Sequence, residues 1–152
     1  MGVAAVCIGL AAGAALADPQ AEISAYRKAH GLSAVTVDAK LMALAARQAE
    51  AMASRGVLEH DAYASFQSRI ASWRPSVAVE NIAMGTTSFA ATLAVWKASS
   101  AHNANLLSRP ARRVGIASAS GHGRLYWALI LAAPDVKPPR LPRDRGVRRV
   151  AR

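Results

Sequence analysis

Three polar side chains carry most of the chemistry that this sequence could support: His60, Glu80 and His102. Each lies beside an apolar or helix-bounding segment. Two histidines and one carboxylate form a ligand set that can hold a divalent metal such as zinc while leaving coordination positions open for water or substrate. The three residues are about 20 positions apart along the chain, which matches no local metal motif. Only the fold could bring them together.

A structural interpretation of the same residues stays open. A histidine that follows a helix is more often a capping or core residue than a metal ligand. If only His60 and Glu80 converge, a metal would be weakly held, and the pair is better interpreted as a hydrogen-bonded histidine and carboxylate that brace the site. We expect His30 and His122, at a helix end and between two glycines, to be exposed or capping.

Serine hydrolase chemistry is not favoured by this sequence. Ser99 and Ser100 lie too close to His102 along the chain to suggest a nucleophile and its base. The sequence has no Gly-x-Ser-x-Gly motif, and no acidic partner for the histidine can be named.

The elements that must position these side chains follow from periodicity and from start and stop residues. Three helices are predicted: one from Asp18 to Gly31, one capped by Asp38 and ended by Gly56, and one after Gly85. Two strands are predicted at 112–120 and 124–132, joined by a tight turn at 121–123. The second strand is apolar almost throughout, which indicates a layer on each of its faces. The pattern predicts an α+β sandwich with helices on a small antiparallel sheet.

The two ends of the chain differ from its body. Residues 1–17 have no charged side chain and end in Ala-Leu-Ala, which predicts a secretory signal peptide cleaved before Asp18 and too short to span a bilayer. Residues 134–152 hold four prolines and seven basic residues against two acidic ones, which predicts a disordered basic tail. The single cysteine, Cys7, excludes an intramolecular disulfide. We therefore expect a secreted or periplasmic protein with one domain at 18–133 and no permanent membrane span after cleavage.

The formal net charge of +10 makes acidic partners plausible from the start. An anionic envelope polymer or a lipid surface fits this charge together with the export signal. Nucleic acid is disfavoured, because Trp73, Trp96 and Trp127 are scattered and expected in the core, so no basic and aromatic platform is visible. We expect a monomer.

Four stretches of the body resemble one known family. They are LMALAARQAEAMASRGVLEHD at 41–61, VENIAMG at 79–85, WKASSAHNANLLS at 96–108 and VGIASASGHGRLYWALILA at 114–132. In this order and at these intervals they resemble the CAP superfamily, which comprises cysteine-rich secretory proteins, antigen 5 and pathogenesis-related protein 1 and is also called SCP-like. The likeness is to its cysteine-free bacterial branch and spans about residues 22–133.

The resemblance implies an α-β-α sandwich with a cleft, in which many members place two histidines and two glutamates that can hold a divalent metal. His60 and Glu80 match the first histidine and the first glutamate. The other two ligands are replaced, by Ser99 and Leu125. His102 belongs to the bacterial Trp-x-x-Ser-x-x-His motif and completes a tentative metal set with His60 and Glu80.

The same resemblance suggests supporting roles. Arg69 resembles a residue that precedes the Glu-Asn-Ile motif in bacterial members, and it could pair with Glu80. We expect Asn81 and Asn105 to hold loop backbone through side-chain hydrogen bonds.

Two functions remain open at this point. The first is a binding module that engages a ligand of the cell envelope without turnover, with a His/Glu cleft that binds a divalent metal weakly. The alternative is a metal-assisted, protease-like hydrolase, with zinc held by His60, Glu80 and His102 and a bound water as nucleophile. The resemblance names no single reaction.

Overall fold

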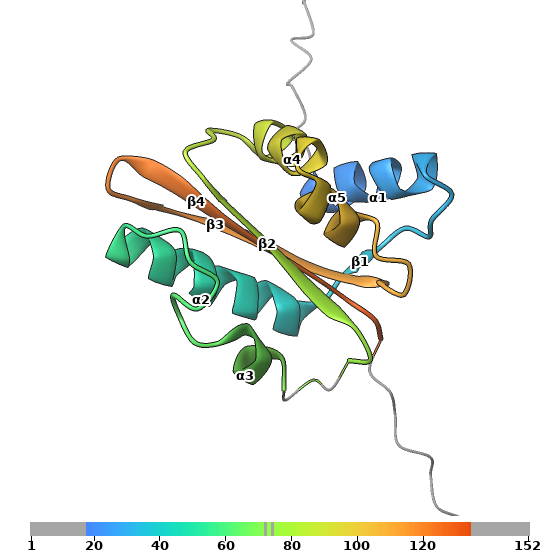
Figure 1. Ribbon diagram of the computed structural model, residues 1–152, viewed down its shortest axis with the longest axis horizontal. Helices are drawn as coiled ribbons and strands as arrows, with labels where there is room; N and C mark the ends of the chain where they lie inside the picture. The colour runs from blue at the N-terminus through green and yellow to red at the C-terminus, as the bar shows by residue number, and fades with distance from the viewer. Residues whose placement is uncertain (1–17, 72, 74, 135–152) are drawn as a thin grey trace, which may run out of the picture.

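Helices cover both faces of one four-stranded sheet (Figure 1). The computed structural model describes residues 18–71, 73 and 75–134. In chain order the elements are α1 (Pro19–Ala29), β1 (Thr36–Val37), α2 (Ala39–Arg55), α3 (Phe66–Ile70), β2 (Ala78–Met84), α4 (Phe89–Ala98), α5 (Ser100–Leu106), β3 (Arg113–Gly121) and β4 (Arg124–Ala132). The predicted α+β sandwich is confirmed. The predicted signal peptide lies outside the described residues, as does the predicted tail beyond Pro134.

The strands are ordered β1-β3-β4-β2. The β3–β4 hairpin and the β2–β4 pair are antiparallel, whereas the short β1 runs parallel to β3 and makes the sheet mixed rather than purely antiparallel. β1 and β2 were not predicted. The predicted strand at 124–132 is β4, which lies between two neighbours and is buried on both faces from Tyr126 onward.

The helix ends follow the predicted capping residues. Asp38 accepts hydrogen bonds from the backbone N–H groups of Lys40 and Leu41 and starts α2, and Gly56 ends it in the left-handed conformation at φ 68°. The helix predicted after Gly85 corresponds to α4, whereas α5, which follows it, was not predicted. Ser99 is extended, at φ −93° and ψ 122°, so it ends α4 and caps α5.

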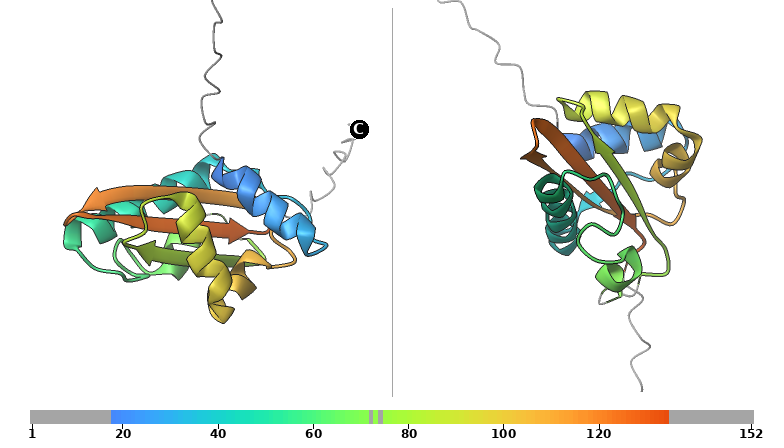
Figure 2. Two further views of the ribbon diagram at one scale, coloured as in Figure 1. Left: turned by 90° about the horizontal axis from the view of Figure 1, so that it is seen from above. Right: turned by 60° about the vertical axis from the view of Figure 1, so that its left-hand side comes forward.

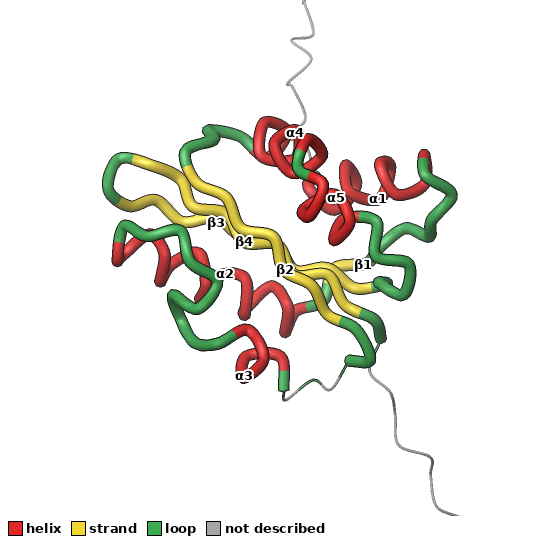
Figure 3. The backbone as a smooth tube through the Cα atoms, viewed as in Figure 1, coloured by secondary structure: helices red, strands yellow, loops and turns green. Residues whose placement is uncertain are grey.

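Each face of the sheet has its own core, and the two layers are visible in the tube drawing and the rotated views (Figures 2 and 3). Ile23, Trp96 and Leu129 belong to the core under α1, α4 and α5. Leu41 and Ile130 belong to the core under α2 and α3. Neighbouring residues of β4 thus point into different cores, as expected for a strand covered on both faces. All three tryptophans are buried, as predicted.

The alanine-rich helix α2 lies very close to β3. A Cβ atom on Gly115 of β3 would collide with the backbone carbonyl of Leu41, and one on Gly121 would collide with the carbonyl of Ala53. Glycine at these two positions therefore allows the helix and the strand to approach each other. No helix within the described residues is long and apolar enough to cross a membrane.

Candidate functional site

A buried ion pair between Arg69 of α3 and Glu80 of β2 forms the base of the candidate site. Arg69 Nη1 lies 2.6 Å from Glu80 Oε2, and Arg69 Nη2 lies 2.9 Å from Glu80 Oε1. The side chains are 1% and 2% exposed. A two-pronged contact between a guanidinium and a carboxylate is the strongest geometry for such a pair. The predicted pairing of these residues is confirmed.

His60 lies on the loop after α2, above this pair. Its Nδ1 atom is 2.9 Å from Glu80 Oε1, and its side chain is 53% exposed. Glu80, as a carboxylate, can only accept hydrogen bonds, so Nδ1 carries a hydrogen and donates it. In the neutral ring the other nitrogen, Nε2, is then a hydrogen-bond acceptor.

The loop that carries His60 is held by side chains from two helices. Arg69 Nη2 donates to the carbonyl of His60 at 2.7 Å, and Arg69 Nε donates to the carbonyl of Ala64 at 2.9 Å. Gln48 of α2 is fully buried; its Nε2 donates to the carbonyl of Glu59 at 2.6 Å, and its Oε1 accepts from the N–H of Tyr63 at 3.2 Å. The position of His60 therefore depends on Gln48 as well as on Arg69.

His102 approaches from the other side of strand β2. It lies on α5, and its Nδ1 atom is buried without a hydrogen-bond partner among the described residues. Burial lowers the pKa of His102, and the charge of His60 lowers it further. The structure therefore places His102 on the α5 side of β2 and shows no hydrogen bond between its Nδ1 atom and His60 or Glu80.

Two asparagines attach α5 to β2. Asn81 Nδ2 donates to the backbone carbonyl of His102 at 3.0 Å. Asn105 Nδ2 donates to the backbone carbonyl of Glu80 at 3.1 Å and to Asn81 Oδ1 at 2.9 Å. Both asparagines thus hold backbone carbonyls, as expected, but these belong to a helix and a strand and not to a loop.

The site lies at the edge of the sheet and joins both layers. Glu80 and Asn81 are consecutive residues of the edge strand β2, so their side chains point to opposite faces. Glu80 pairs in register with Ile130, of the core under α2, and Asn81 with Leu129, of the other core. One strand therefore positions His60 through Glu80 and His102 through Asn81.

The arrangement does not provide a three-ligand metal centre ready for use. No group of three His, Cys, Asp or Glu side chains that could hold a metal occurs in the part of the chain that the structure describes. Glu80 is almost fully buried, and its two oxygens already accept three hydrogen bonds from Arg69 and His60, which leaves the carboxylate little access to a metal. Metal binding by His60, Glu80 and His102 stays a prediction.

Ser99 and Leu125 stand where the family has its other two ligands. Neither side chain contributes to the cluster of His60, Arg69 and Glu80. The Ser99 side chain accepts from the backbone N–H of His102 and caps α5. Leu125 packs against the core under α1, α4 and α5. Two hollows, of about 370 and 350 Å³, lie at the β3–β4 hairpin and beside α3, and neither is lined by His60, Glu80 or His102.

The family model described as the cysteine-rich secretory protein family, CAP, matches residues 20–131, most of the chain. The protein belongs to the CAP family. No curated protein matches the sequence at a significant level. The match confirms the family that the four sequence stretches indicated, and it lies within the domain predicted at 18–133.

Solved structures of other CAP domains have the same fold. An outer surface protein from Borrelia burgdorferi is 17% identical, with a TM-score of 0.69 over 76% of this chain and 89% of that one. An extracellular protein containing an SCP domain, from Bacillus anthracis, is 20% identical, with a TM-score of 0.67 over 76% of this chain but 39% of that one. A cysteine-rich secretory protein from Staphylococcus aureus is 16% identical, with a TM-score of 0.60 over 75% and 37%. This CAP chain therefore spans well under half the length of the last two.

Sequence reasoning found the residues of the cluster but missed one of its supports. His60, Arg69 and Glu80 were all named from the sequence. The role of Gln48 was not, although a signal existed: it is a polar residue at a position that repeats with the apolar face of α2.

Proposed function

We propose that this CAP domain is a ligand-binding module that is exported and acts at the cell envelope without turning its ligand over. The observation that carries the proposal is that Glu80 is buried and bound to both Arg69 and His60. Its charge is balanced by a buried guanidinium, and its oxygens are occupied by Arg69 and His60. A carboxylate held in this way orients His60 and is poorly placed to act as a base or as a metal ligand.

His60 supplies the recognition chemistry. Because its Nδ1 is bound to Glu80 and half of its side chain is exposed, the ring presents Nε2 outward in a fixed orientation. A neutral Nε2 accepts a hydrogen bond from a hydroxyl or amide group, which are the groups that glycan and peptide polymers of an envelope offer. The lowered pKa of His102 keeps the neighbouring ring uncharged near neutral pH.

Two further observations support an envelope location. The net charge of +10 favours anionic polymers and anionic surfaces. Similar structures include an outer surface protein and an extracellular protein, although the likeness to them is one of fold.

A metal-assisted hydrolase that uses His60, Glu80 and His102 is the alternative. It would require Glu80, whose side chain is 2% exposed and bound to Arg69 and His60, to become accessible to the metal. A calorimetric zinc titration tests it: tight binding that His60→Ala, Glu80→Ala and His102→Ala each abolish, in variants that still fold, would favour the hydrolase. Absent binding, or binding indifferent to His102, would favour the module without turnover.

The binding proposal is tested with purified peptidoglycan as the probe. The protein is sedimented with insoluble peptidoglycan at moderate salt, and the bound fraction is compared with that of His60→Gln. Loss of one ligand hydrogen bond should weaken binding by roughly five- to tenfold. His30→Gln is the matched control, because His30 is exposed at the end of α1 and contacts only the carbonyl and ring of Tyr26.

Two results would contradict this proposal. One is the absence of any binding to peptidoglycan by the wild-type protein. The other is release of soluble fragments that a chelator stops, since that would reveal turnover and favour the hydrolase.

A further inference from the structure

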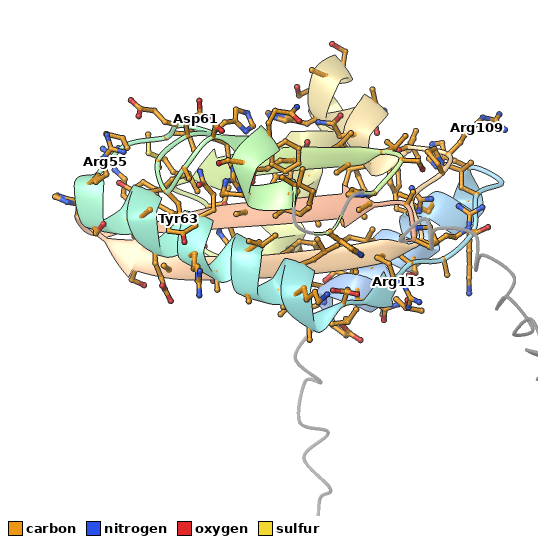
Figure 4. The ribbon with its side chains drawn as sticks, turned by 90° about the horizontal axis from the view of Figure 1, so that it is seen from below. Arg55, Asp61, Tyr63, Arg109 and Arg113 are labelled. Carbon is orange, nitrogen blue, oxygen red and sulfur yellow. The ribbon has the colours of Figure 1, made fainter. Side chains whose placement is uncertain are left out.

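Three exposed arginines follow α5 within five positions: Arg109, Arg112 and Arg113. We call them the arginine surface. Arg109 and Arg113 lie at one end of the molecule, and Arg55, Asp61 and Tyr63 lie toward the other end (Figure 4). The arginine surface is thus distinct from the loop that carries His60.

Backbone and hydroxyl groups hold two of the three guanidinium groups. Arg112 Nη1 donates to the carbonyls of Arg109 and Ala111, at 2.7 and 2.8 Å. Arg113 Nη1 donates to Thr36 Oγ1 at 2.7 Å. No carboxylate of the described residues forms a salt bridge with any of the three. A guanidinium has five N–H donors, so most of these donors remain free for an external anion.

A fourth guanidinium lies buried behind this surface. Arg27 of α1 is fully buried and donates to the carbonyls of Leu106, Ser108 and Ala111. Burial lowers its pKa, and the nearby charge of Arg112 lowers it further. Arg27 thus anchors the loop that carries the arginine surface, and its charge adds to the positive field there.

The basic C-terminal sequence starts at the same place. Arg113 pairs with Ala132 in the β3–β4 ladder, and the N–H of Arg112 donates to the carbonyl of Ala132 at 2.9 Å. Strand β4 ends there, so the chain leaves the sheet next to the arginine surface. The sequence from residue 134 to 152 adds seven basic residues and two acidic ones.

We propose that the arginine surface is a membrane-binding face that docks the protein on the anionic phospholipid headgroups of a bilayer. Guanidinium groups bind phosphate oxygens in a two-pronged geometry. A flat bilayer needs accessible positive charge rather than a groove, and all three arginines are exposed.

A soluble polyanion is the less favoured partner. A single-stranded nucleic acid, for example, is commonly held in a basic groove with aromatic side chains on which its bases stack. No aromatic residue is present among residues 107–113, and the exposed Tyr63 lies toward the other end of the molecule (Figure 4). The choice between the two partners is made in the experiment.

The test measures cosedimentation of the full chain with vesicles. Vesicles of phosphatidylcholine alone report the contribution of the apolar residues 1–17, and vesicles that also contain phosphatidylglycerol add the anionic headgroups. The charge-removing variant is Arg109→Gln/Arg112→Gln/Arg113→Gln. We expect the part of the binding that requires phosphatidylglycerol to fall by at least about tenfold and to fall also with salt.

The matched control is Arg47→Gln/Arg55→Gln/Arg124→Gln, which removes the same charge from exposed positions outside the arginine surface. We expect it to change binding by less than about threefold. Arg109→Glu is a second test variant, because the Arg109 side chain has no hydrogen-bond or salt-bridge partner within the described residues, and only its backbone carbonyl accepts a hydrogen bond, from Arg112.

Three results would overturn the proposal. In the first, the triple variant or folded Arg109→Glu binds phosphatidylglycerol vesicles as well as the wild type. In the second, the control variant loses as much binding as the test variant, which would indicate attraction by net charge alone. In the third, the protein binds soluble polyphosphate but no vesicle, which would assign the face to a free polymer.

Discussion

Arg69 and Glu80 form a two-pronged ion pair whose side chains are only 1% and 2% exposed. Arg69 also donates to the carbonyls of His60 and Ala64. One guanidinium therefore neutralises the carboxylate that orients His60 and also holds the backbone of the loop that carries it. Stability and site geometry depend on the same side chain.

Replacing Arg69 with methionine should lower the free energy of unfolding by about 3–5 kcal/mol, because it leaves the Glu80 carboxylate buried without its partner. Urea denaturation followed by circular dichroism measures the change. The double variant Arg69→Met/Glu80→Leu should recover much of the loss, since an apolar pair replaces a broken ion pair. Arg47→Met, at an exposed position, is the control. A double variant as unstable as the sum of its single variants would contradict this account.

Gln48→Leu should loosen the His60 loop while keeping the shape of α2. The substitution leaves the carbonyl of Glu59 and the N–H of Tyr63 without their side-chain partner, at a cost of about 1–3 kcal/mol. Limited proteolysis should then cut first within residues 57–65. Glu50→Leu, on the exposed face of the same helix, should leave the cleavage pattern unchanged; an unchanged pattern in Gln48→Leu would show that other contacts suffice.

The lowered pKa of His102 makes stability depend on pH in a defined direction. In the unfolded chain the histidine takes up a proton near its ordinary pKa of about 6.5, whereas in the folded protein it does so only at lower pH. The unfolded state therefore binds more protons in this window, and folding stability falls as the pH drops below about 6.5.

The variant His102→Gln isolates this effect. Urea unfolding of the wild type and of the variant at pH 7.5 and pH 5 gives the difference in their pH slopes, and we expect the wild type to lose more stability toward pH 5. His30→Gln should retain the wild-type slope. Equal slopes in the wild type and His102→Gln would mean that His102 titrates alike in both states.

Gly115→Ala should destabilise the fold by about 1–3 kcal/mol or more, because the new methyl group would collide with the backbone of α2 at Leu41. A thermal melt is sufficient to detect the change. Ser118→Ala, at an exposed position of the same strand, is the control and should shift the melting temperature little. An equal effect of the two substitutions would place the helix farther from the strand than described.

The long elements were predictable because each has local signals. Asp38 and Gly56 mark the two ends of α2, and the apolar run of β4 indicates burial on both faces. β1 and α3 escaped prediction because two and five residues are too short to show a period. Ser99 separates α4 from α5. A serine can also occur within the last turn of a helix, so this residue type gives no clear stop signal.

The residues of the site could be predicted from the sequence, but the geometry of the contacts between them could not. The family resemblance and residue chemistry indicated His60, Arg69 and Glu80. The bidentate geometry of Arg69 and the support from Gln48 depend on how α2, α3 and β2 approach one another in space, and no spacing along the chain encodes that. The attachment of His102 to β2 through Asn81 depends likewise on both layers meeting at one edge strand.

Consecutive residues of β2 link the two helical layers of the molecule, Glu80 to the His60 loop and α3, and Asn81 to α5. Local opening of one layer would release its partner side chain on β2, either Glu80 or Asn81. Because the two residues are consecutive, this opening would also expose the side chain that holds the other layer. Backbone amides in α3 and α5 should therefore exchange with solvent as one cooperative unit, despite lying on opposite faces of the sheet. In this CAP domain the edge strand β2 therefore couples the local stability of the helical layers on the two faces of the sheet.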